Sequence, residues 1–184
     1  MNHLAMTGAL GFSALVGSIA VTRPASAFQL CNYVQEHGVS RCMMGFGQGQ
    51  PIKLRYGSPG WSMLQWSEVS WMNTNYSFVQ LVNGNGNNQC IGAAGGKIDN
   101  GTPIISWNCN NNLSSTDQAW HPVLAGYWQD SSVPCYYLVD EPTASWPTPR
   151  VIGVPAGNVV YNAGLVLWDH ISSAPDQLWC VFDN

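Results

Sequence analysis

Charged residues are scarce in this chain. Lysine, arginine, aspartate and glutamate make up 9% of the sequence, whereas an average soluble domain has about 25%. The six basic residues form no run, and the formal net charge is −4. Because nucleic-acid binding depends on clustered basic residues that neutralise phosphates, we expect no nucleic-acid partner. The polar surface must come mainly from Asn, Ser, Gln and Gly, as in many secreted domains that bind neutral ligands.

Helical periodicity is also missing after residue 28. The apolar runs there are short, rich in β-branched and aromatic residues, and separated by Gly, Asn and Pro turns, a pattern that predicts strands. These runs are 79–82, 104–107, 135–139, 159–161 and 165–168. The chain is therefore predicted to be all-β.

One longer apolar stretch lies at the N-terminus, from Leu4 to Val21. It is followed by Ala25-Ser26-Ala27, a small-residue cleavage pattern, so residues 1–27 are predicted to be a signal peptide. The n-region lacks Lys and Arg, and a retained membrane anchor is the alternative. Cleavage leaves residues 28–184, enough for one domain. We therefore expect a secreted mature protein that does not span the membrane.

A short pattern occurs three times between residues 29 and 179. Each copy contains short apolar strands and ends at a Trp. Such a repeat cannot bury its own core, so three copies of about four strands each predict a β-trefoil. The copies cover residues 29–66, 79–120 and 137–179, ending at Trp66, Trp120 and Trp179.

Six cysteines fit an oxidising compartment, and all six follow residue 27. Cys90 and Cys109 occupy two strand positions that one repeat brings together, so we predict a disulfide between them. The other four, Cys31, Cys42, Cys135 and Cys180, allow three pairings. The pairings within single repeats, Cys31–Cys42 and Cys135–Cys180, are favoured.

The second and third repeats contain a Gln-x-Trp motif, in Asp117-Gln118-Ala119-Trp120 and Asp176-Gln177-Leu178-Trp179. Together with Cys90-Ile91-Gly92 and the strand that ends at Trp107, they resemble the ricin B-type lectin family over most of residues 28–182. The resemblance implies a β-trefoil with Trp66, Trp120 and Trp179 in the core. It also implies a non-catalytic, carbohydrate-binding protein. In the first repeat Leu64 replaces the Gln, so that copy is degenerate.

In this family a sugar pocket combines an aromatic ring, a polar residue before the Gln, and a carboxylate after the first cysteine. The ring stacks on the apolar face of a sugar, and the carboxylate accepts hydrogen bonds from hydroxyls. The resemblance therefore implies binding residues Trp107, Asp117, Gln118, Trp168, Asp176 and Gln177. Tyr56 is the aromatic candidate in repeat one. At the carboxylate position the sequence has Met44, Gly92 and Gly153, so we expect weak, multivalent binding through degenerate pockets.

Other functional patterns are weak. The histidines have no metal-ligand spacing, no Ser lies in a Gly-x-Ser-x-Gly elbow, and we expect no catalytic residue, metal or cofactor. The absent carboxylates and the excess of tryptophan leave a second function open, an accessory or cell-binding subunit of a secreted toxin or another interaction module. Trp61, Trp66 and Trp71 are candidates for its protein-binding surface. A protease inhibitor or an enzyme is the remaining alternative.

Overall fold

The computed structural model describes residues 27–58, 61–72, 77–110 and 116–183, so the predicted signal peptide lies almost wholly outside the described residues and stays a prediction. The described chain is all-β. Its twelve strands are β1 (Phe28–Glu36), β2 (Val39–Met44), β3 (Lys53–Tyr56), β4 (Gln65–Met72), β5 (Ser77–Asn83), β6 (Gln89–Ala93), β7 (Ile104–Asn108), β8 (Trp120–Tyr127), β9 (Pro134–Asp140), β10 (Arg150–Gly153), β11 (Val166–Asp169) and β12 (Trp179–Asp183).

Short 3₁₀ helices connect many of these strands. They are η1 (Ser62–Leu64), η2 (Ala94–Gly96), η3 (Thr116–Gln118), η4 (Trp128–Asp130), η5 (Glu141–Thr143), η6 (Pro155–Gly157) and η7 (Pro175–Gln177). Three of them, η1, η3 and η7, immediately precede the equivalent strands β4, β8 and β12. They therefore mark the same point in each of the three repeats.

Six strands form a closed barrel. Antiparallel pairing runs from β1 to β4, β5, β8, β9, β12 and back to β1. Closure leaves no unpaired edge in this ring. Residues of one strand face alternate sides, so Phe28 and Leu30 on β1 reach the main core.

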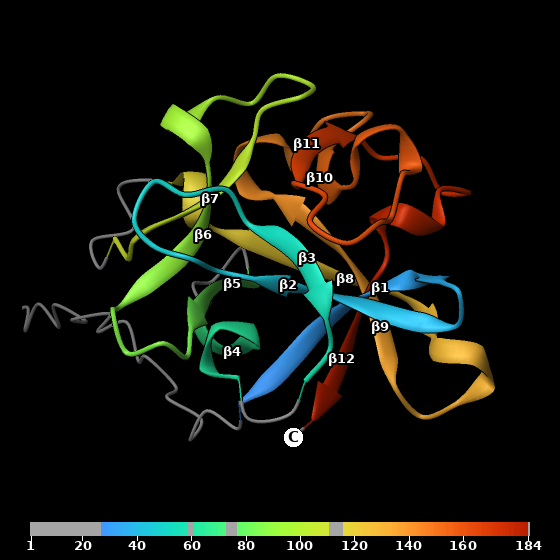
Figure 1. Ribbon diagram of the computed structural model, residues 1–184. Coiled ribbons are helices and arrows are strands. Elements are labelled where there is room, and N and C mark those ends of the chain that lie inside the picture. The colour runs from blue at the N-terminus through green and yellow to red at the C-terminus, as the bar shows by residue number, and fades with distance from the viewer. Residues whose placement is uncertain (1–26, 59–60, 73–76, 111–115, 184) are drawn as a thin grey trace, which may run out of the picture.

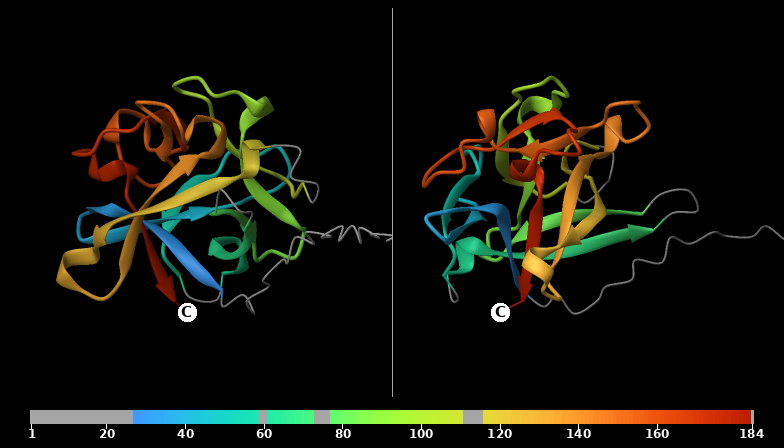
Figure 2. Two further views of the ribbon diagram at one scale, coloured as in Figure 1. Left: turned by 180° about the vertical axis from the view of Figure 1, so that it is seen from behind. Right: turned by 90° about the vertical axis from the view of Figure 1, so that its right-hand side faces the viewer.

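The other six strands form three hairpins, β2–β3, β6–β7 and β10–β11. Isolated bridges join them cyclically, at Pro51–Ile105, Pro103–Val166 and Lys53–Gly164. Hairpins β6–β7 and β10–β11 lie at one end of the molecule, and the end of β12 lies at the other (Figures 1 and 2). Barrel and hairpins together make a threefold β-trefoil.

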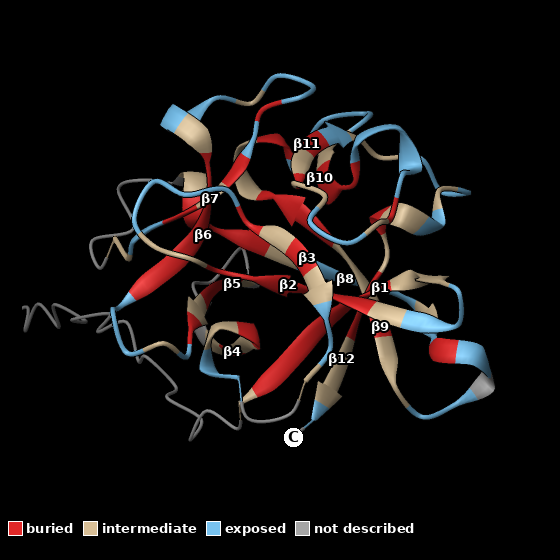
Figure 3. Ribbon diagram, viewed as in Figure 1, coloured by how far each residue is buried: buried red, intermediate tan, exposed pale blue. Residues whose placement is uncertain are grey.

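Three tryptophans hold the repeats together in the same way. Trp66, Trp120 and Trp179 are fully buried in the main core, together with residues of β1 and β6, strands that show buried segments in Figure 3. Their Nε1 atoms donate to the carbonyl oxygens of Met43 (3.0 Å), Ile91 (3.2 Å) and Ile152 (2.9 Å). Each ring thus fills the core while its one polar atom is satisfied.

Three disulfides are present: Cys31–Cys42, Cys90–Cys109 and Cys135–Cys180. Each joins residues within one repeat, because the strands of a repeat pair or neighbour one another. Cys31 lies opposite Cys42 on β2 and opposite Cys180 on β12.

The proposed surface cluster of repeat-one tryptophans does not form as expected. Trp66 is in the core, because it occupies the position of Trp120 and Trp179, whereas Trp61 is 54% exposed. The Trp71 side chain lies outside the described part of the structure.

Candidate functional site: two equivalent pockets

Strand register defines which residues are equivalent in the three hairpins. Trp107 pairs with Cys90, Trp168 pairs with Val151, and Arg55 pairs with Cys42. Two residues further along the ladder, Ile105 pairs with Gly92, Val166 with Gly153, and Lys53 with Met44. Between the two pairs of each repeat lies the residue whose carbonyl oxygen accepts from the core Trp: Met43 in repeat one, Ile91 in repeat two and Ile152 in repeat three.

In repeat two, a cavity of about 390 Å³ lies against hairpin β6–β7. It brings together Trp107 from β7 and Asp117 from η3, two residues that the sequence placed in one site. The rest of its wall is small or apolar: Gly92, Ala93, Gly95, Gly96 and Ile105. Trp107 is 46% exposed, so the ring is available to a ligand.

Repeat three repeats this arrangement at hairpin β10–β11. A cavity of the same volume, about 390 Å³, brings Trp168 from β11 together with Asp176 and Gln177 from η7. Trp168 is 44% exposed, close to the value for Trp107. Two symmetry-related surfaces thus present the same pair of chemical groups, an indole ring and a carboxylate.

The two carboxylates have different surroundings. Asp176 accepts from the Val154 N–H through Oδ2 (3.4 Å). Asp117 has an Oδ1 atom that is buried without a hydrogen-bond partner among the described residues, and burial raises the pKa of this carboxyl. A buried acceptor without a partner is energetically costly.

Packing explains why Gly92 and Gly153 occupy the positions at which the family has a carboxylate. A Cβ at Gly92 would lie 3.0 Å from Cγ of Gln118 and 3.3 Å from the Asp117 carbonyl oxygen. A Cβ at Gly153 would lie 3.1 Å from Cγ of Gln177. The 3₁₀ helix therefore packs directly on the strand, and its own Asp takes the place beside the Trp.

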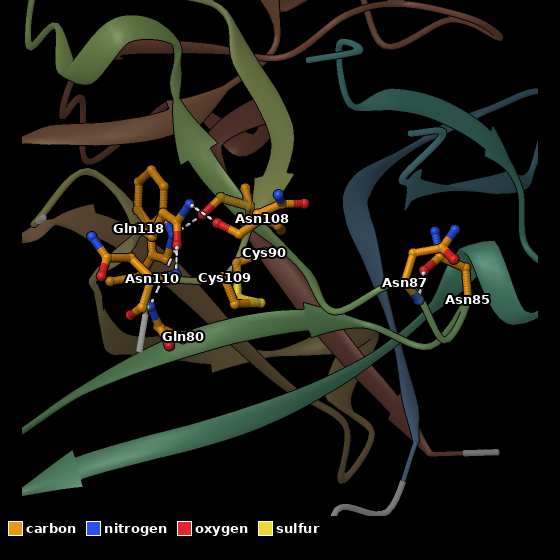
Figure 4. The surroundings of a disulfide bond; sticks show 10 residues. Gln80, Asn85, Asn87, Cys90, Asn108, Cys109, Asn110 and Gln118 are labelled. Carbon is orange, nitrogen blue, oxygen red and sulfur yellow. Dashed lines mark hydrogen bonds between the residues drawn. A yellow bond between two sulfur atoms is a disulfide. The ribbon is translucent and has the colours of Figure 1, made fainter. Parts of the chain in front are cut away.

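Gln118 and Gln177 are buried and hydrogen-bonded to backbone. Gln118 donates to the Asn108 carbonyl oxygen (2.9 Å) and accepts from the Asn110 N–H (2.8 Å), beside the Cys90–Cys109 disulfide (Figure 4). Gln177 does the same with Asp169 (2.8 Å) and Ile171 (2.9 Å). Both amides thus tie η3 and η7 to the ends of β7 and β11, which positions the neighbouring Asp.

Asp140 is a buried carboxylate, although its place beside Glu141 at a strand end favours a solvated position when the sequence is read alone. It is fully buried, and both side-chain oxygens lack a hydrogen-bond partner among the described residues. Desolvation, followed by the charges of Glu141 and Asp117, raises its pKa to about 7, and Arg150 opposes this shift. Asp140 therefore lies within electrostatic range of the repeat-two pocket.

Its equivalents in the other repeats are asparagines. Asn32 pairs with Trp179, Asn83 with Trp66, and Asp140 with Trp120. The Asn32 amide donates to the Asp176 carbonyl oxygen (2.7 Å), and the Asn83 amide donates to the Met63 carbonyl oxygen (3.0 Å). The comparison of strand ends across the three repeats is the sequence signal that would have found Asp140.

In repeat one the predicted aromatic residue, Tyr56, does not occupy the position equivalent to Trp107 and Trp168. The register places Arg55, not Tyr56, at the position of Trp107 and Trp168. Met44 and Leu64 are buried where the other repeats have Gly and Gln, and Met63 and Phe46 pack against them. An apolar cluster therefore replaces the carboxylate side of the pocket.

The described parts of the chain contain neither a candidate metal site nor a candidate membrane-spanning helix. Residues 27–183, apart from the gaps named above, contain no group of three or more His, Cys, Asp or Glu that could hold a metal ion. In the same ranges, no helix has the length and apolar character needed to cross a membrane.

No protein-family model matches the chain, and no curated protein matches its sequence. Solved structures do match it. The designed threefold symmetric protein ThreeFoil matches with a TM-score of 0.63 and 12% identity, over 86% of this chain and 99% of that one. A mosquitocidal holotoxin matches with a TM-score of 0.61 and 14% identity over 89% of this chain. A Polyporus squamosus lectin, solved with a sialylated epitope, matches with a TM-score of 0.53 and 12% identity over 87% of it.

The share of the matched protein varies widely. The chain spans 18% of the holotoxin chain and 49% of the lectin chain, but nearly all of ThreeFoil. At identities this low the similarity concerns the fold, and it agrees with the barrel, the three hairpins and the equivalent tryptophans. By its fold, this chain is a β-trefoil protein.

Proposed function

We propose that this protein is a secreted, non-catalytic carbohydrate-binding domain of the ricin B type, with sites in repeats two and three. The observation that carries the proposal is the pairing of an exposed Trp with an Asp on one cavity, twice, at equivalent positions. The indole ring offers a flat apolar surface to the C–H face of a sugar. The carboxylate accepts hydrogen bonds from hydroxyls beside that face.

In this proposal the ligand's hydroxyls meet Asp117 and Asp176, not a residue after the first cysteine. Gly92 and Gly153 leave room for the 3₁₀ helices that carry these carboxylates. Gln118 and Gln177 hold the helices in place, so their contribution to binding is through position. Each pocket supplies one ring and one carboxylate, so binding is weak per site and depends on several sites engaging one surface.

The test is binding to immobilised neutral glycans by the wild type, Trp107→Ala, Trp168→Ala and the double variant. We expect each single variant to bind less and the double variant to lose most binding to neutral glycans. Exposed Tyr127→Ala on β8 is a matched aromatic control that should bind as the wild type does. No glycan binding by the wild type, or full binding by the double variant, would contradict the proposal.

A second candidate is an accessory or cell-binding subunit that contacts another protein. The observation in its favour is a group of exposed apolar side chains on β8: Val123, Leu124 and Tyr127 are 48%, 52% and 55% exposed. Exposed apolar groups of this kind mark interaction surfaces when they are contiguous. Co-purification of a second exported polypeptide, lost in Leu124→Asp but retained in Trp107→Ala, would favour this function over the first.

A further inference from the structure

Repeat one carries the opposite charge from the two pockets. Arg55 and Lys53 stand where repeat two has Trp107 and Ile105, and where repeat three has Trp168 and Val166. Met63 stands before Leu64, as Asp117 stands before Gln118. The equivalent surface of repeat one thus has two cations and lacks the Asp. With Arg41, strands β2 and β3 hold three of the six basic residues of the chain.

The Arg55 guanidinium is held in a defined orientation. Its Cζ lies 5.0 Å from the Phe46 ring centroid and 4.6 Å from that of Tyr161. Its Nη1 donates to Oδ1 of Asn162 (2.6 Å), and this hydrogen bond is exposed to solvent. A guanidinium has five N–H donors, so one such bond orients the group without exhausting it.

Asn162 itself distinguishes this site from the other two. Its N–H donates to the Leu54 carbonyl oxygen (2.8 Å), as Gly49 donates to Ser106 (2.7 Å) and Gly101 to Leu167 (2.8 Å). All three residues have a left-handed backbone, with φ of 70°, 75° and 85°. Glycine adopts it freely, and a Cβ at Gly49 would lie 3.3 Å from the Trp107 ring. In repeat one this position has a side chain, that of Asn162, and its Oδ1 accepts the hydrogen bond from the Arg55 guanidinium.

Tyr161, which lies beside Arg55, contacts a second exposed ring, that of Tyr56. Tyr56 and Tyr161 are about half exposed, and their centroids lie 5.2 Å apart. Beneath Tyr56, Cζ of the buried Arg41 lies 4.0 Å from the ring centroid. Arg41 forms an ion pair with Glu36, while its Nε and Nη1 are buried without a hydrogen-bond partner among the described residues.

We propose that this surface, formed by Lys53, Arg55, Tyr56, Tyr161 and Asn162, binds a sugar that carries a carboxylate. The planar guanidinium matches a carboxylate through two parallel N–H···O bonds, and Lys53 adds a second positive charge. The tyrosine rings provide the stacking face that Trp107 and Trp168 provide in the other repeats. The choice of a sugar as ligand rests on the proposed carbohydrate-binding function, whereas the anionic group follows from the charge.

The experiment uses the Trp107→Ala/Trp168→Ala variant as background, so that the two other pockets do not contribute. The probes are an immobilised uronic-acid oligosaccharide and its carboxyl-reduced, neutral counterpart. We expect binding to the acidic probe only, and Arg55→Gln should weaken it by roughly tenfold or more, the loss of a charge-assisted bond. Lys97→Gln also removes one positive charge, but from repeat two, and should leave binding to the acidic probe unchanged.

A swap keeps the proposal testable if Arg55→Gln affects folding. Arg55→Trp combined with Asn162→Gly installs the residues of repeats two and three, and should abolish acidic-probe binding while the thermal unfolding midpoint is kept. Equal binding of both probes, or acidic-probe binding that survives the loss of Arg55, would overturn the inference. Failure of the wild type to bind neutral glycans would remove the proposed function instead, without affecting this result.

Discussion

At the scale of single residues, three tryptophans do the same structural task at three places. Each has no exposed surface, and each donates through Nε1 to a carbonyl of the neighbouring hairpin. A large aromatic side chain in such a position contributes both buried area and one satisfied hydrogen bond. Loss of any one therefore leaves a large cavity and an unpaired buried carbonyl.

Trp120→Ala is expected to lower the free energy of unfolding by about 3–5 kcal/mol, as for other buried large aromatics. Urea unfolding with disulfides intact measures it. The half-exposed Trp107→Ala is the matched control and should cost much less, because solvent already reaches that ring. A cost for Trp120→Ala below about 1 kcal/mol, outside the range for a buried aromatic, would rule out a core position.

We expect Asp140 to make the stability of the fold depend on pH. Its pKa is raised to about 7 in the folded protein, from a usual value near 3.8. Between these values the folded state binds the extra proton, so stability falls as pH rises from about 4 to 7 and then levels off. The difference corresponds to an order of 4 kcal/mol at most, at about 1.36 kcal/mol per pKa unit.

Asp140→Asn should remove this loss, because an amide does not ionise. We expect its side chain to donate to the Asp117 carbonyl oxygen, as Asn32 donates to Asp176. Unfolding of both proteins at pH 5, 6, 7 and 8 isolates this group, since the other titrating residues are shared. The difference in unfolding free energy between the variant and the wild type should grow as pH rises from 5 to 7 and then level off. A difference that does not change with pH would refute the assignment of this titration to Asp140.

At the scale of elements, each pocket depends on how closely a 3₁₀ helix packs on a hairpin strand. In repeat two, η3 packs on β6 so closely that a Cβ at position 92 meets backbone as well as the Gln118 side chain. The helix is also tied to the end of β7 by Gln118. The position of Asp117 is therefore set by two strands and one buried amide.

Gly92→Ala should displace η3, cost about 1–3 kcal/mol of stability, as overpacking does, and weaken glycan binding in repeat two. Gly164→Ala is the matched control: its Cβ would meet nothing within 4 Å. Unfolding and glycan binding are measured on both variants. If Gly92→Ala behaved like the control, the close packing of η3 on β6 would be wrong.

At the scale of the whole molecule, the threefold fold places two equivalent pockets on one protein. The hairpins that carry the two Trp–Asp pockets lie at the same end of the molecule (Figure 1). When two linked sites engage one surface, the second binding step is intramolecular, and avidity exceeds the single-site affinity by roughly 10²–10⁴. The repeats also differ in chemistry, since Arg55 and Asn162 stand in repeat one where repeat two has Trp107 and Gly49.

Either Trp107→Ala or Trp168→Ala should therefore reduce binding to a dense glycan surface by roughly tenfold or more, as one site of a bivalent pair is lost. The affinity of the remaining pocket for the soluble monovalent sugar should not change. Surface binding at several glycan densities, compared with calorimetry on the soluble sugar, tests this. Density-independent binding in the wild type would show that the pockets act singly.

Much of the fold was predictable from the sequence. The strand-sized runs, the three copies and the equivalent Trp66, Trp120 and Trp179 follow from local patterns, since apolar spacing and a repeat period are read along the chain. The Cys90–Cys109 pairing follows for the same reason, because it lies within one repeat.

The tertiary structure alone decided which side chains share a face and which contact one another. Only the strand register placed Arg55 at the position of Trp107, and a one-residue shift in a strand moves a side chain to the other face. Only packing showed that Gly92 makes room for η3, and that Asp140 is buried without a partner. These properties depend on distances between residues far apart in the chain, which a repeat pattern does not contain.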